Sequence, residues 1–133
     1  MDDADAFLAK AGENLAAAES EFAAGRYNSC ANRAYYACYQ AAVAALLRDD
    51  VRPSGKNGQW GHDFVQAQFA GLLITRRKRY PASLRDVLRE TMAIRHRADY
   101  QPDGVGRSRG MRSLQEARRF LSEIRHKEGI RDA

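Results

Sequence analysis

The stretch from residue 28 to residue 48 constrains the fold more than any other part of the chain. Its apolar residues recur at three- and four-residue spacing, which is the period of an α-helix. They form one face, made by Ala31, Ala34, Tyr35, Cys38, Ala42, Ala45 and Leu46, and a second side, made by Tyr36, Val43 and Leu47. A helix that is apolar over so wide an arc needs more than one neighbour to cover it. We therefore predict that it is the central helix of a bundle.

Four further amphipathic segments lie before and after this helix. We expect one helix over residues 5–24, a second that starts near His62, a third that is capped by Ser83, and a last one over residues 111–124. Loops are expected at 49–61 and 101–110. Asn28 or Ser29 can cap the central helix. No segment alternates with period two, so no strand is expected. The predicted fold is all-α, a bundle of four to five helices formed by residues 1–133 as a single domain.

The composition favours an ordinary globular protein, with 44% apolar and 29% charged residues. The chain has no apolar run long enough for a membrane span, and its acidic start, MDDADAFLAK, differs from a targeting segment. We expect a cytoplasmic protein without membrane association. Cys30 and Cys38 would lie about 12 Å apart along one helix, too far for a disulfide. Neither has a partner at metal-ligand spacing, so both are predicted to be core residues, and no metal or cofactor is expected.

Charge is distributed unevenly along the chain. Residues 1–66 carry a net charge of −3, whereas residues 67–133 carry +8. This asymmetry is typical of a protein whose basic half binds an anionic partner. It can equally reflect a general preference for arginine, because the chain has eighteen Arg and only four Lys. Both interpretations stay open on charge alone.

Arg95 occupies an unusual position on the predicted fourth helix. On a wheel of 100° per residue it lies about 20° from Leu84, in the middle of the apolar face. A buried arginine needs a partner, and Asp99 is four residues away, within reach on the same helix. We predict a partly buried Arg95–Asp99 pair whose remaining guanidinium donors are free for a phosphate. His96 is predicted to point away from this face.

Aromatic residues offer further candidates for ligand contact. Tyr35, Tyr36 and Tyr39 can stack on bases, or they can fill the core and a dimer interface. Trp60 and His62 follow a Gly-rich loop and can line a ligand cleft, or they can serve packing and helix capping. Core and packing roles are the more common for such residues.

Several strings in the chain resemble the HEPN family, the small helical domains first noted as higher-eukaryote and prokaryote nucleotide-binding domains. These strings are NSCANRAYYACYQAAVAALL at 28–47, HDFVQAQF at 62–69 and AIRHRADY at 93–100. The last is similar to the Arg-x-x-Ala-Asp-Tyr segment of one subgroup. The resemblance implies a compact up-and-down helical bundle of HEPN type. It also implies a homodimer that often works with a nucleotidyltransferase partner.

The resemblance also bears on catalysis. Many relatives are metal-independent ribonucleases, including toxins of toxin–antitoxin pairs, in which an Arg and a following His act on the RNA 2′-hydroxyl and phosphate. Here Arg95 matches the motif Arg, but Asp99 or Tyr100 fills the place of the His. Arg89 and His96 have a matching spacing, but they come too early in the family register.

Three functions follow from these observations. The first is an RNA- or nucleotide-binding module in a toxin–antitoxin or nucleotidyltransferase-linked system, without fast cleavage. The second is a metal-independent ribonuclease, with Arg95, His96, Asp99 and Tyr100 as candidate catalytic residues. The third is a protein-interaction partner without an anionic ligand. For the first, the predicted nucleic-acid-binding residues are Arg76, Arg77, Lys78, Arg79, Arg97, Arg107 and Arg109.

Overall fold

The computed structural model describes residues 2–53 and 56–129, and every regular element within these ranges is helical. The long helices are α1 (Asp3–Ala23), α2 (Tyr27–Arg48), α4 (Val87–Tyr100) and α5 (Arg107–Lys127). A shorter helix, α3 (His62–Ala67), continues as the π-helical segment η2 (Gln68–Arg76). Single 3-10 turns occur at η1 (Lys56–Gly58) and η3 (Ala82–Leu84). The all-α prediction is confirmed.

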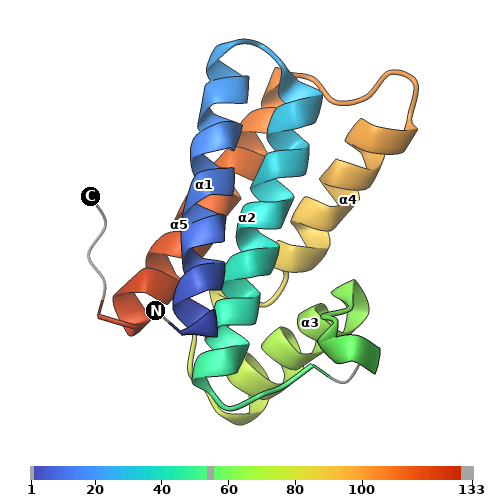
Figure 1. Ribbon diagram of the computed structural model, residues 1–133. Helices are drawn as coiled ribbons and strands as arrows, with labels where there is room; N and C mark the ends of the chain where they lie inside the picture. The colour runs from blue at the N-terminus through green and yellow to red at the C-terminus, as the bar shows by residue number, and fades with distance from the viewer. Residues whose placement is uncertain (1, 54–55, 130–133) are drawn as a thin grey trace.

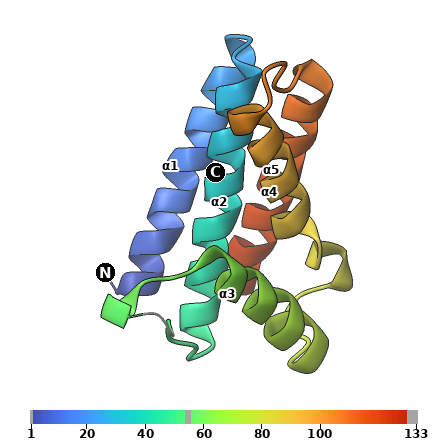
Figure 2. The same cartoon turned by 90° about the vertical axis from the view of Figure 1, so that its right-hand side faces the viewer.

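The four long helices run lengthwise beside one another and alternate in direction, whereas α3 and η2 lie across one end of the bundle (Figure 1). Turning the molecule by 90° shows the same arrangement, with α3 below the others (Figure 2). This is the predicted up-and-down bundle. None of the described helices is long and apolar enough to cross a membrane.

The centre of the bundle is α2, as its sequence pattern predicts. Twelve of its residues are buried, and seven of these are alanines, which let neighbouring backbones approach closely. Tyr35 is fully buried, whereas Tyr36 and Tyr39 are half-buried at the edge of the core. Cys30 and Cys38 are both buried and unpaired, as predicted for core residues.

Two helix starts differ from their prediction because the proposed cap residues have other roles. The second helix starts at Tyr27, and the side-chain oxygen of Asn28 accepts a hydrogen bond from the backbone N–H of Val105 at 2.8 Å. Ser83 lies within the turn η3, so α4 starts four residues later, at Val87. By contrast, α1 has a complete capping box in which Asp2 and Asp5 satisfy each other's backbone N–H groups.

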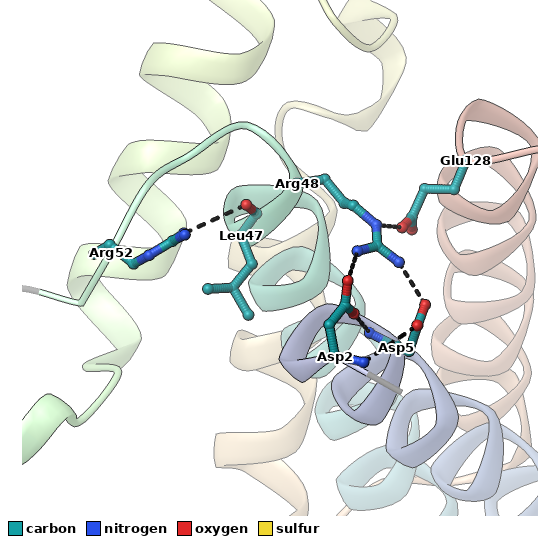
Figure 3. Close-up of polar contacts among 6 residues, drawn as sticks. All are labelled: Asp2, Asp5, Leu47, Arg48, Arg52 and Glu128. Carbon is teal, nitrogen blue, oxygen red and sulfur yellow. Dashed lines mark hydrogen bonds and ion pairs between the residues drawn. The ribbon is translucent and has the colours of Figure 1, made fainter.

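One arginine ties three helix ends together, as Figure 3 shows. Arg48, at the end of α2, donates from Nε to Glu128 at 2.6 Å and from Nη1 to Asp2 at 2.6 Å. Its third nitrogen pairs with Asp5. The side chain of Glu128 is only 7% exposed. The two ends of the described chain are therefore fastened to the end of the central helix.

Candidate functional site

Arg95 projects from α4 onto the aromatic edge of α2. Its guanidinium carbon lies 5.5 Å from the ring centroid of Tyr35 and 5.2 Å from that of Tyr36. The Arg95 side chain is 13% exposed. A guanidinium this close to aromatic faces is attracted by their electron-rich centres, which offsets part of the cost of burying it. The predicted partial burial of Arg95 is confirmed.

Asp99 holds the guanidinium in this position. Arg95 donates from Nε to Asp99 Oδ2 at 3.1 Å, and Asn32 on α2 donates to the same oxygen at 3.2 Å. Nη1 of Arg95 points to the sulfur of Met92 at 3.4 Å. Within the described residues, Nη2 has no hydrogen-bond acceptor, so its N–H groups stay available. The predicted Arg95–Asp99 pair is confirmed.

A second arginine, which the sequence pattern did not single out, lies at the same edge. The guanidinium carbon of Arg33 is 5.5 Å from the Tyr36 ring centroid. Arg33 donates to Asn32 Oδ1 from Nε at 3.1 Å and to Asn14 Oδ1 from Nη1 at 3.1 Å. A hydrogen-bonded chain therefore runs from Arg33 through Asn32 and Asp99 to Arg95, and both guanidinium groups contact one tyrosine.

His62 joins the cluster from the start of α3. Its Nδ1 lies 2.6 Å from the hydroxyl oxygen of Tyr35, and its ring centroid is 4.7 Å from that of Tyr39. Burial lowers the pKa of His62, and the positive charge of Arg95 lowers it further. Burial raises the pKa of Tyr35, which keeps the phenol protonated. The Tyr35 hydroxyl and Nδ1 of His62 therefore share a hydrogen bond whose donor is set by the tautomer of the neutral imidazole.

The other candidate catalytic residues lie at the outside of α4. His96 is exposed, as the helical wheel predicts, and its ring meets that of Tyr100 edge to face at 5.6 Å. Tyr100 is 70% exposed. The structure therefore brings Arg95 and Asp99 together with Asn32, Arg33 and His62, and it leaves His96 and Tyr100 on the adjacent surface.

The candidate nucleic-acid-binding residues fall into two groups at opposite ends of the bundle (Figure 1). Arg76 ends η2 and residues 77–79 follow it, near the end of α2, whereas Arg107 and Arg109 lie in the first turn of α5, near the end of α4. Arg77 and Arg79 pair with Asp49 at 2.9 and 3.2 Å, and Arg97 pairs with Asp103 at 2.8 Å. Arg107 lies over the ring of Phe22 at 5.2 Å, and the side chains of Arg76, Lys78 and Arg109 are exposed. The two groups therefore lie apart and do not form one continuous groove. Their role in nucleic-acid binding stays a prediction.

Acidic residues, His and Cys do not gather in threes at metal-binding distance anywhere in residues 2–53 and 56–129. The chemistry of the cluster is that of an anion site, with two positioned guanidinium groups, one carboxylate and a neutral imidazole N–H. The sequence pattern did not identify Arg33 and Asn32 as site residues, because the residues that they contact in the cluster are far away in sequence. The only signal was an arginine three residues before a tyrosine on an otherwise apolar helix.

No curated protein matches this chain. A family model described as HEPN domain matches residues 4–127, which is nearly the whole chain and includes every residue of the cluster. The chain therefore belongs to the HEPN domain family.

Proposed function

We propose that the protein binds RNA or a nucleotide, and that Arg33 and Arg95 hold a phosphate beside Tyr36. The observation that carries this proposal is the placement of both guanidinium groups against one tyrosine ring, 5.5 and 5.2 Å from its centroid. Because HEPN domains are often ribonucleases or components of toxin–antitoxin pairs, we place this binding in a toxin–antitoxin or nucleotidyltransferase-linked system.

The charge of the cluster supports an anionic ligand. Asp99 pairs with Arg95, whereas Arg33 donates to the neutral amides of Asn32 and Asn14 and has no ion-pair partner among the described residues, which leaves an excess positive charge in the cluster. An arginine fork matches the oxygens of a phosphate, and Nη2 of Arg95 keeps its donors for that purpose. Because the hydrogen-bonded chain through Asn32 fixes both side chains in advance, little conformational entropy is lost when a phosphate binds.

The state of His62 argues for binding rather than fast cleavage. Cleavage at the RNA 2′-hydroxyl needs a group that accepts its proton at hydrogen-bond distance. Nδ1 of His62 is already hydrogen-bonded to the Tyr35 hydroxyl, so this nitrogen is not free to accept the proton of a 2′-hydroxyl. His96 is exposed and packs against Tyr100.

Metal-independent ribonuclease activity is the second candidate, and the position of His62 beside Arg95 is the observation that favours it. A metal-free incubation with EDTA tests this candidate directly. We expect no cleavage of single-stranded RNA beyond the background without protein. Cleavage that disappears in His62→Ala or His96→Ala, with the fold intact, would establish the ribonuclease and contradict the binding-only interpretation.

Binding itself is tested by fluorescence anisotropy with a labelled single-stranded RNA. We expect Arg33→Ala to weaken binding about tenfold, because it removes one charge-assisted phosphate contact of roughly 1.4 kcal/mol. Arg118→Ala is the matched control, since Arg118 is half exposed on α5 and pairs with Glu19. Equal affinities for the wild type and Arg33→Ala would refute the role of Arg33.

A further inference from the structure

A pocket opens directly beside the arginine pair. It has a volume of about 420 Å³ and lies between α1, α2 and the last turn of α4. Its lining includes Ala17 and Glu21 from α1, Asn28, Ser29 and Arg33 from α2, and Asp99 from α4. This is the end of the bundle where α1 passes into α2 and where α4 ends, at the top of Figure 1. Arg33 and Asp99 belong both to this pocket and to the phosphate-binding cluster.

The pocket differs chemically from the cluster beside it. Asp99 uses Oδ2 to hold Arg95 and Asn32, which leaves Oδ1 as an acceptor. Glu21 uses Oε2 to hold Arg26, which leaves Oε1 as an acceptor. Among the described residues, the oxygen of Asn28 accepts from Val105 while its amide NH₂ has no partner, so the NH₂ is a donor, and the hydroxyl of Ser29 can also donate. Apart from Arg33, which the pocket shares with the cluster, the polar lining therefore presents acceptors and neutral donors.

We propose that this pocket is a nucleoside subsite, which binds the sugar and base of the nucleotide unit whose phosphate lies on Arg33 and Arg95. Ribose hydroxyls and exocyclic base amines are donors that match the free oxygens of Asp99 and Glu21. The two carboxylates repel a second phosphate, so the ligand enters with its uncharged part. A volume of 420 Å³ falls within the usual range for small-ligand pockets. This inference rests on the proposed phosphate binding and specifies its ligand.

Variants that fill the pocket test the nucleoside subsite independently of the phosphate site. Ala17→Leu places a larger side chain in the lining while keeping a strong helix former in α1. Ala16→Leu is the matched control, because the neighbouring Ala16 is exposed and does not line the pocket. Ser29→Leu fills the same pocket from α2, so the test holds even where Ala17→Leu fails to fold. Circular dichroism checks each fold.

Calorimetric titrations use inorganic phosphate, AMP and a short single-stranded RNA as probes. We expect the wild type to bind AMP or the RNA more tightly than phosphate. Ala17→Leu and Ser29→Leu should weaken that binding about tenfold and leave phosphate binding unchanged, and Ala16→Leu should change neither. If the two pocket variants lose affinity for AMP, the ligand is a free nucleotide. If they lose affinity for the RNA alone, the ligand is an RNA strand.

The same titrations distinguish failure of this inference from failure of the proposed function. Wild-type affinity for AMP and RNA in both pocket variants, together with lost phosphate binding in Arg95→Ala, would refute the nucleoside subsite alone. Phosphate and RNA binding that survive in Arg95→Ala would refute the proposed function. No binding of any probe to the wild type would refute both.

Discussion

Replacing Arg95 with alanine should destabilise the fold as well as weaken binding. The change removes two contacts with aromatic rings, at 5.5 and 5.2 Å, and the pair with Asp99. Each ring contact is worth about 0.5–1 kcal/mol, and the partly buried ion pair adds about 1 kcal/mol. The expected loss in the free energy of unfolding is therefore about 2–3 kcal/mol. At about 4 °C per kcal/mol for a domain of this size, Tm should fall by roughly 8–12 °C.

Thermal and urea unfolding followed by circular dichroism measure this loss. Arg89→Ala is the matched control, because it makes the same substitution on the same helix at a side chain that is 72% exposed. We expect this control to change the free energy of unfolding by less than about 0.5 kcal/mol. If Arg95→Ala lowers the free energy of unfolding no more than Arg89→Ala, the inference that the Arg95 guanidinium stabilises the fold is wrong.

Three further predictions concern other parts of the molecule. Because its pKa in the folded state is lowered from 6.5, His62 should make the protein less stable as pH falls from about 6.5 through the folded-state pKa. His62→Gln should flatten the dependence of Tm on pH in this window. An unchanged profile would contradict the link between the lowered pKa of His62 and stability. Arg48→Met should cost about 1–2 kcal/mol in urea unfolding, because it leaves the buried carboxylate of Glu128 without its cation. Arg52→Met, whose guanidinium donates to two backbone carbonyls at 3.4 Å, should cost little, and equal losses in the two variants would refute the stabilising role of Arg48. Family membership supports a homodimer, so light scattering should give twice 14.9 kDa, and a mass near 14.9 kDa at micromolar concentration would refute it.

The sequence was sufficient to predict the helical class, the central helix and the Arg95–Asp99 pair. Each depends on local periodicity, which survives folding because residues three and four apart share a helix face. The boundaries were harder to predict. The sequence pattern predicts Asn28 as a helix cap, but its side-chain oxygen instead accepts a hydrogen bond from the backbone N–H of Val105. The π-helical segment from Gln68 to Arg76 has no compositional signal that distinguishes it from an α-helix.

The rest of the site could not be predicted because it depends on contacts between distant residues. Arg33 and Arg95 meet at Tyr36 only because α2 and α4 pack side by side, and His62 joins them from a third helix. The basic run at 76–79 looked like a single anion-binding patch. In the structure, Asp49 neutralises two of its members, and the pairing depends on where α2 ends. Neither outcome follows from spacing within one segment.

The salt dependence of RNA affinity in the wild type and Arg95→Met tests the central claim most directly. Methionine retains an unbranched apolar side chain over the tyrosine rings but removes the charge and the donors. If Arg95 contacts one phosphate, the slope of log K against log salt should become shallower by about 0.7 in Arg95→Met, together with weaker binding at low salt. Identical slopes and affinities for the two proteins would contradict the claim that Arg95 holds a phosphate.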